Sequence, residues 1–319
     1  MAAGVAVWVL PITPARGWPV FAQLVAIDRI FVVLLCAVAA AAALIVWWRP
    51  NHRVRAAAVA SGTILLAAMF GGRALVQGVA DGSDPPAVGS VAAVSWNADG
   101  ADPMQLSDAL RGMIGQFGVD IVVLPETGWK SGELVHRNLG DAGVDAVVYA
   151  PEWTATAVLL SRQLADAGEY RVDTEETPPW AGLALVPARP SPDTPIIVAT
   201  HLQQPSVGST HVWRDHLDWV GRMCQTSPYV VVLGDMNATL NNLGGESVGG
   251  CGDVAASHGA GAAATWPTTL PSWLGVSIDR FMVGRGFDVR SATFRVLRSV
   301  PLEGTDHWPI LVSFSPDDE

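Results

Sequence analysis

Positive charge is scarce in this sequence. Only 15% of the 319 residues are charged, and the formal net charge at pH 7 is −11. Residues 86–319 hold 13 Lys and Arg against 27 Asp and Glu, a net charge of −14, whereas residues 1–85 hold six Arg and three Asp. A surface that binds a polyanion usually presents a patch of Lys and Arg. The acidic region lacks such an excess, which argues against nucleic acid as its ligand.

Heptads and internal repeats are also missing, which excludes a long coiled coil and a repeat array. A chain of this length holds one large domain, or one domain with an accessory region. Half of the residues are hydrophobic, which is high for a soluble protein. A membrane segment is therefore expected.

The first long apolar run, Ile30–Trp48, contains no charged residue. As a helix it would rise roughly 28 Å, which matches the hydrocarbon core of a bilayer. Trp47 and Trp48 stand at its end, where aromatic anchors at a membrane interface are common. The run predicts a transmembrane helix; the alternative is a helix buried in a soluble core.

A second apolar run, Ala56–Gly72, follows a short basic connection, Arg49–Arg55. Because cytoplasmic loops are enriched in Lys and Arg, the connection is predicted to lie in the cytoplasm. The two helices then form a hairpin within a membrane-anchor region of residues 1–80, and the chain beyond lies outside the cytoplasmic membrane. Residues 1–28 are compatible with an interfacial stretch, a poor signal sequence or the remnant of another spanning helix.

Residues 81–87 are predicted to be a linker, because they are rich in Gly, Ser, Asp and Pro. Strands and helices then alternate over residues 88–316. Strands are predicted at 91–95, 120–124, 146–149, 155–161, 183–186, 196–200, 230–234, 277–283, 289–296 and 310–314. Helices are predicted at 103–117, 132–139 and 210–223. The Gly- and Ala-rich stretch Gly244–Ala264 has no periodicity and is predicted to be a loop.

The sequence has only three cysteines, and Cys36 lies within the first apolar run. Cys224 and Cys251 flank the apolar run Val230–Leu233. An extracytoplasmic location would permit a disulfide between these two residues. The alternative is a pair of free thiols.

The segment Val230–Asn237 reads Val-Val-Val-Leu-Gly-Asp-Met-Asn. Its four apolar residues predict a buried strand, after which Gly234 permits a turn. Asp235 and Asn237 are two residues apart, so they project to the same side of the extended chain. Both offer oxygen ligands for a hard divalent cation, and the amide also donates to phosphoryl oxygens. Alone, the pair is weak evidence, because a strand that ends in Gly-Asp before a loop is more often an ordinary turn.

Polar residues follow several other predicted strands in the same way. Functional groups at strand ends gather on one rim of a layered α/β fold. Each residue alone has an ordinary explanation, such as a turn, a helix cap or a loop histidine. Together they supply an amide, carboxylates and two histidines, the set that a Mg²⁺-dependent phosphoesterase needs. The candidates are Asn97, Glu126, His201, Asp235, Asn237, Asp279, Asp306 and His307.

Seven short segments around these residues resemble the endonuclease/exonuclease/phosphatase superfamily. They read Ser-Trp-Asn-Ala98, Leu-Pro-Glu-Thr127, Ala-Thr-His-Leu202, Gly-Asp-Met-Asn237, Thr-Trp-Pro267, Ser-Ile-Asp-Arg280 and Thr-Asp-His-Trp308. The resemblance covers about residues 88–316 and implies a four-layer α/β/β/α sandwich with its site at one edge of the two sheets. The hairpin resembles the membrane-anchored bacterial branch of this superfamily.

The resemblance implies a site for Mg²⁺ or Mn²⁺. Glu126 matches the principal metal carboxylate, and Asn97 matches the amide beside it. Asp306 matches a metal or outer carboxylate. Arg280 departs from the pattern, because His or Tyr is frequent at that position, but this change removes no catalytic group.

The catalytic roles are implied in the same way. Asp235 and Asn237 match residues that hold the nucleophilic water and the phosphate. His307, oriented by Asp279, matches the general base or a phosphate-stabilising imidazole. His201 matches a second histidine, which contacts a phosphate oxygen or assists the leaving group.

The expected protein is a membrane-anchored, extracytoplasmic phosphoesterase that acts on a lipid-linked or small phosphodiester or phosphomonoester. The alternatives are an extracytoplasmic nuclease and a noncatalytic binding module of the same fold. The bilayer is the expected partner, and nucleic acid is disfavoured by the acidic charge. Four tryptophans are candidates for contact with lipid or sugar, or for the core: Trp129, Trp153, Trp180 and Trp273.

Overall fold

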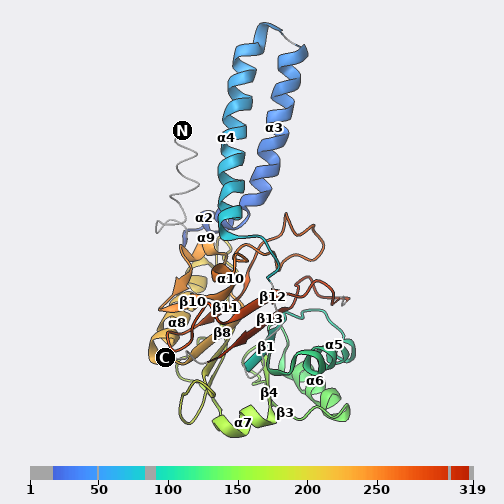
Figure 1. The fold of residues 1–319 in the computed structure, drawn as a ribbon, viewed down its shortest axis with the longest axis vertical. Coiled ribbons are helices and arrows are strands. Elements are labelled where there is room, and N and C mark those ends of the chain that lie inside the picture. Colours follow the sequence, from blue (N-terminus) through green and yellow to red (C-terminus); the bar gives the residue numbers. More distant parts are fainter. Residues whose placement is uncertain (1–16, 49, 83–90, 301–302, 316–319) are drawn as a thin grey trace.

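The computed structural model describes residues 17–48, 50–82, 91–300 and 303–315. Two long helices project from one end of a globular region (Figure 1). They are α3 (Asp28–Trp48) and α4 (Arg53–Gln77), which pack against each other as an antiparallel pair. Both helices extend beyond the apolar runs that predicted them.

Both long helices are apolar and long enough to cross a membrane. In the most apolar 18-residue stretch of each helix, only 11% of α3 and 12% of α4 is buried inside the protein. The core helix of a soluble protein would be mostly buried. The exposed apolar surface therefore disfavours the soluble-core alternative.

The globular region contains two β-sheets that face each other across the main hydrophobic core. The six-stranded sheet has the order β12-β13-β1-β2-β4-β3. Its strands are β1 Val91–Ser95, β2 Val119–Leu124, β3 Ala146–Tyr149, β4 Ala157–Ser161, β12 Thr293–Val296 and β13 Ile310–Phe314. The seven-stranded sheet has the order β5-β6-β7-β8-β11-β10-β9. Its strands are β5 Arg171–Val172, β6 Gly182–Val186, β7 Ile196–His201, β8 Val230–Asp235, β9 Ser247–Val248, β10 Cys251–Asp253 and β11 Asp279–Val283.

Helices cover the outer face of each sheet. α5 (Pro103–Phe117) and α6 (Trp129–Asp141) pack on the six-stranded sheet through a cluster that includes Leu110. α8 (Thr210–Thr226) packs on the seven-stranded sheet through a cluster that includes Trp219. The layers are α/β/β/α, which confirms the predicted fold.

The ends of α5 follow directly from its sequence. The Asp102 carboxylate accepts hydrogen bonds from the backbone N–H groups of Met104 and Gln105, and Pro103 occupies the first helical position. Gly118 ends the helix with a left-handed φ of 63°, which costs glycine little. The predicted boundaries of this helix are therefore confirmed.

The pairing of β8 aligns the polar strand ends. All six residues of β8 are buried, as expected for a strand covered on both faces. β8 pairs in parallel with β7, which sets His201 beside Asp235, and antiparallel with β11, which sets Asp279 opposite Asp235. Three polar side chains therefore start from the same edge of one sheet.

Two predictions about the irregular parts of the fold were wrong, and one helix was missed. Residues 244–264 form β9, β10 and α10 (Val254–Ser257) instead of a single loop. The strand predicted at 289–296 begins only at Thr293, and α7 (Arg162–Gly168) was not predicted. The elements within residues 244–264 span only two to four residues, too few to create a periodic pattern. They form because β10 pairs with the distant β11.

A disulfide joins Cys224 in α8 to Cys251 in β10. The two cysteines are 27 residues apart in sequence, and the bond ties the covering helix to β10, the second strand from one edge of the sheet. Cys36 is a free cysteine in α3.

The predicted linker begins as part of the globular region. The Asp81 carboxylate pairs with the Arg298 guanidinium, and Gly82 forms a β-bridge with Arg295 in β12. At the base of the hairpin, the Asn241 side chain donates to Asp28 at 3.0 Å and accepts from Gln77 at 2.9 Å. The hairpin is therefore docked on the globular region at its base. Residues 83–87 of the predicted linker lie outside the described residues.

We expect Gly234→Ala to destabilise the protein strongly. Gly234 has a φ of +141°, and an added Cβ would lie 2.2 Å from the backbone oxygen of Thr200. Such strain costs about 1–3 kcal/mol before the overlap is counted. The midpoint of thermal unfolding of the full-length protein in detergent should fall by at least about 5 °C.

Gly112→Ala is the matched control, because an added Cβ there meets no atom within 4 Å. Gly112 lies inside α5, where alanine favours the helix by up to about 1 kcal/mol. Its unfolding midpoint should stay the same or rise. Equal midpoints for the two variants would contradict the close packing of β8 on β7.

Candidate active site

The predicted site residues lie at one edge of the two facing sheets. Asn97 follows β1 and Glu126 follows β2, whereas His201 and Asp235 end β7 and β8. The antiparallel strands β11 and β13 begin at this edge, and they bring Asp279 and the preceding His307 to it. Segments separated by up to about two hundred residues therefore meet in one place.

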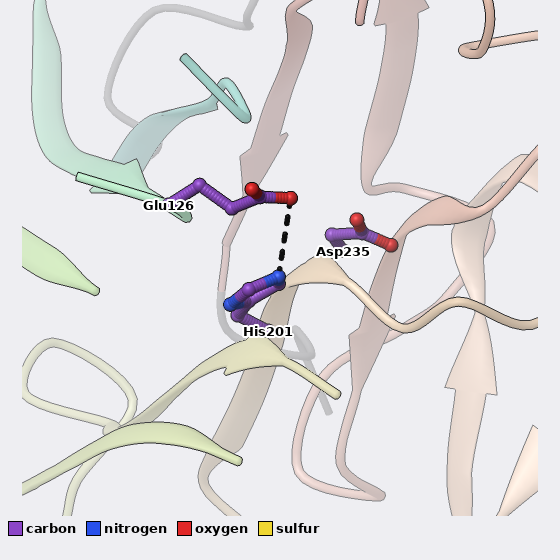
Figure 2. A group of neighbouring side chains, drawn as sticks. All are labelled: Glu126, His201 and Asp235. Carbon is purple, nitrogen blue, oxygen red and sulfur yellow. Dashed lines mark ion pairs between the residues drawn. The ribbon is translucent and has the colours of Figure 1, made fainter. Parts of the chain in front are cut away.

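Glu126, His201 and Asp235 form the first group that can hold a cation (Figure 2). One ligand atom from each lies within 4.8 Å of the others, and His201 Nε2 is 3.3 Å from Glu126 Oε1. The Asn97 amide donates to Glu126 Oε1 at 2.8 Å and to Asp235 Oδ2 at 3.1 Å. Asn97 thus bridges the two carboxylates.

The backbone of Glu126 is strained. Its φ is 56°, in the left-handed region, which non-glycine residues seldom adopt. Strain of this kind persists where the surrounding structure enforces it, and it clusters at functional sites. The turn after Pro125 directs the partly exposed Glu126 carboxylate toward His201.

Asp235, Asp279 and His307 form the second group, and all three are buried. His307 Nδ1 is 2.8 Å from Asp279 Oδ2, and His307 Nε2 is 3.9 Å from Asp235 Oδ2. The backbone N–H of Asp279 donates to Thr265 Oγ1 at 3.1 Å. Asp279 therefore holds the His307 ring with its second nitrogen directed toward Asp235.

The pKa values reflect this crowding of charges. The hydrogen bond from His201 outweighs burial and lowers the pKa of Glu126 to about 2. Burial and the charge of Asp279 raise the pKa of Asp235 to about 6. Burial opposes protonation of His307, but the charge and hydrogen bond of Asp279 outweigh it and raise the His307 pKa to about 9. Perturbed pKa values of this kind concentrate at functional sites.

Asn237 and Asp306 lie at the same pocket in supporting positions. The Asn237 backbone N–H donates to Asp235 Oδ1 at 2.8 Å, and its side-chain amide donates to the backbone oxygen of Leu202 at 2.9 Å. Asp306 Oδ2 accepts from Trp266 Nε1 at 2.7 Å, and Asp306 Oδ1 is 3.7 Å from His307 Nε2. Asp306 belongs to neither of the two groups described above.

Six of the predicted site residues line a pocket of about 700 Å³: Glu126, His201, Asp235, Asn237, Asp306 and His307. Trp180 and Trp266 also line it, whereas Trp129, Trp153 and Trp273 are not among its lining residues. Three further lining residues come from the N-terminal segment, and no sequence pattern marked them as site residues: Gln23, Ala26 and Ile27. The role of Thr265 in holding Asp279 was also not predicted, because a hydroxyl next to a Trp-Pro turn has no distinctive pattern.

The donor set of the first group suits a hard divalent cation. Mg²⁺ and Mn²⁺ prefer carboxylate and amide oxygens. The nitrogen of the Asn97 amide faces the two carboxylates, and rotation about its terminal torsion would present the oxygen instead. Glu126 and Asp235 therefore supply the carboxylates of a candidate metal site, with Asn97 able to join them.

Comparison with solved structures gives similar but distant folds. D. rerio TDP2 complexed with single strand DNA product is 18% identical, with a TM-score of 0.49 over 71% of this chain and 99% of that chain. Truncated Caenorhabditis elegans TDP2 is 18% identical, with a TM-score of 0.49 over 71% and 98%. An endonuclease/exonuclease/phosphatase from Bacteroides vulgatus is 15% identical, with a TM-score of 0.49 over 72% and 99%.

A search of curated proteins found no match. The family model of the Endonuclease/Exonuclease/phosphatase family, in contrast, matches residues 94–307. This match covers more than half of the chain and runs from β1 to His307, so it includes both groups of site residues. The chain therefore belongs to the endonuclease/exonuclease/phosphatase family.

Proposed function

We propose that this protein is a membrane-anchored phosphoesterase that uses Mg²⁺ or Mn²⁺ to hydrolyse a phosphodiester or phosphomonoester. One observation carries the proposal: Glu126, Asp235 and His307 converge on a single pocket although they are far apart in sequence. Enzymes of this family hydrolyse phosphoesters and are generally metal-dependent. Both the acidic group and the oriented imidazole of such a site are present in this chain.

Each residue has a definite task in the proposed reaction, and Asp235 has two. Glu126, with Asn97 and Asp235 beside it, would hold the cation, which supplies charge neutralisation at the phosphoryl and leaving oxygens. Asp235 orients the attacking water and accepts its proton. Asn237 holds Asp235 through its backbone N–H. Asp235 itself is buried.

The two histidines would act on the phosphate. His307 directs Nε2 into the pocket while Asp279 holds Nδ1, so it donates a hydrogen bond to a phosphoryl oxygen. His201 would assist the leaving oxygen from the opposite side, next to Glu126. Asp306 serves as an outer carboxylate in this scheme, because Trp266 already engages one of its oxygens.

The proposed location is outside the cytoplasmic membrane, with residues 1–80 as the anchor and residues 88–316 as the catalytic domain. The basic connection between α3 and α4 supports a cytoplasmic hairpin tip. The disulfide between Cys224 and Cys251 supports an oxidising compartment for the globular region. The two observations agree. If the tip of the hairpin is cytoplasmic, both of its ends, and the globular region to which they connect, lie on the other side of the membrane.

A substrate screen with the full-length protein in detergent tests this function. The substrates are bis(p-nitrophenyl) phosphate, phospholipid micelles, sugar phosphates and supercoiled plasmid, each with Mg²⁺, with Mn²⁺ and with a chelator. We expect chelator-sensitive hydrolysis of at least one small or lipid phosphoester. Preference for plasmid would indicate a nuclease instead, and the absence of any hydrolysis would indicate a binding module.

A further inference from the structure

One wall of the active-site pocket comes from the segment just before the hairpin. The short helix α2 (Phe21–Ala26) and the following Ile27 lead directly into α3 (Figure 1). Gln23, Ala26 and Ile27 line the same pocket as Glu126 and His201. A segment adjoining a candidate membrane helix thus lies within reach of a bound substrate.

Specific contacts hold this wall in place. Ala22 is fully buried, and its backbone oxygen accepts a hydrogen bond from Asn242 Nδ2 at 2.8 Å. The Gln23 amide nitrogen donates to the backbone oxygen of Pro205, which also lines the pocket. The Gln23 side-chain oxygen is buried and has no hydrogen-bond partner among the described residues. The Gln23 side chain is therefore fixed against the globular region at the wall of the pocket.

The outer side of the same segment exposes large apolar side chains. Trp18 is 52% exposed, Val20 51%, and Phe21 and Leu24 37% each. Trp18 and Phe21 pack edge to face, with their ring centroids 6.5 Å apart. Aromatic and aliphatic side chains beside a spanning helix favour the interfacial layer of a bilayer. This segment leads in the chain into α3, which also exposes apolar side chains, so one occupant, the bilayer, would cover both.

The composition of the pocket disfavours a polyanionic substrate. Among the described residues that line it, none is Lys or Arg, and four are carboxylates: Asp99, Glu126, Asp235 and Asp306. A nucleic-acid strand needs basic side chains along several phosphates. A single phosphoester held by one cation does not need such a row of basic side chains. The exposed Trp180 lines the pocket as well and adds apolar surface for a lipid backbone.

We propose that the segment 18–27 is an interfacial wall of the active site that selects a phosphodiester carried by a membrane lipid. Its outer side chains lie in the bilayer surface, and its inner side chains, led by Gln23, contact the headgroup beside the scissile ester. This inference rests on the proposed phosphoesterase function. On this inference, the protein distinguishes a substrate that lies in a bilayer from the same headgroup free in solution.

The test compares one headgroup in two presentations. The full-length protein is reconstituted with Mg²⁺ in vesicles of long-chain phosphatidylglycerol, and separately assayed in detergent on dihexanoyl phosphatidylglycerol, which stays monomeric in water. The measured quantity is the rate at which the water-soluble cleavage product is released. We expect the bilayer substrate to be cleaved at least about tenfold faster, because the anchor raises its effective concentration at the pocket.

Leu24→Ser should lower the ratio of bilayer to monomer rates by about tenfold, because it weakens the contact of the wall with the bilayer. Leu24→Phe, which keeps an apolar side chain, should restore the ratio. Leu134→Ser is the matched control: Leu134 is 38% exposed on α6, far from the hairpin (Figure 1), and its replacement should leave the ratio unchanged. Thermal unfolding of each variant shows whether it is folded.

The outcomes separate this inference from the proposed function. Hydrolysis of bis(p-nitrophenyl) phosphate without cleavage of either phosphatidylglycerol overturns the interfacial wall and leaves the phosphoesterase standing. The same holds if the monomer is cleaved as fast as the bilayer, or if folded Leu24→Ser keeps the wild-type ratio. Hydrolysis confined to other substrates of the screen above likewise overturns only the inference. Failure to hydrolyse any substrate of that screen overturns the proposed function, and the inference with it.

Discussion

His307→Ala is expected to lower kcat for a phosphodiester by about 10²–10³-fold, the usual loss when one oriented hydrogen-bond donor to the transition state is removed. His307 Nε2 faces the pocket, and Asp279 fixes the ring at 2.8 Å. Without the imidazole, the developing charge on the phosphoryl group loses a donor that is already oriented. Steady-state kinetics with saturating Mg²⁺ measure the effect.

Asp279→Asn should cost less than His307→Ala, because the imidazole remains and loses only its anionic partner. His211→Ala provides the control, since His211 is an exposed residue on α8. The thermal unfolding midpoint must be followed for both site variants, because Asp279 and His307 are buried partners. A folded His307→Ala variant with wild-type activity would refute the catalytic assignment.

Glu126→Gln is expected to lower activity by roughly a thousandfold at low Mg²⁺, since a bound cation supplies several kcal/mol of charge stabilisation in such reactions. Glutamine keeps the size of the side chain and can still contact His201, but it loses the anionic oxygen that a hard cation prefers. High Mg²⁺ or Mn²⁺ should restore part of the rate. A titration of activity against metal concentration measures this shift.

Glu133→Gln is the control for this variant. Glu133 is an exposed carboxylate on α6, on the segment that follows Glu126. Its replacement removes the same charge from the chain without touching the pocket. If both variants show the wild-type metal dependence, Glu126 does not hold the cation.

Much of the fold and the candidate site could be predicted from short local patterns. The buried run Val230–Leu233 predicted β8, and the capping pair Asp102-Pro103 predicted the start of α5. Polar residues at strand ends predicted the convergence, because the sheets bring those ends to one edge. The residue types at a strand end can be read from a single segment of the sequence. Which other residues lie beside them in space depends on the fold.

The features that could not be predicted depend on contacts between distant segments. The strand β10 exists because it pairs with β11, not because its three residues favour a strand. Thr265 became part of the site only through its bond with Asp279. The wall formed by α2 depends on Asn242, some 220 residues further along the chain. No periodic pattern encodes such pairings.

Crystals of the full-length protein soaked with Mn²⁺ test the central claim most directly, because anomalous scattering locates the cation without reference to activity. The claim is that distant acidic, amide and imidazole side chains assemble one cation-binding pocket. It predicts an anomalous peak within ligand distance of the Glu126 carboxylate, in the pocket shared with Asp235 and His307. A peak bound elsewhere, with none at Glu126, would contradict it.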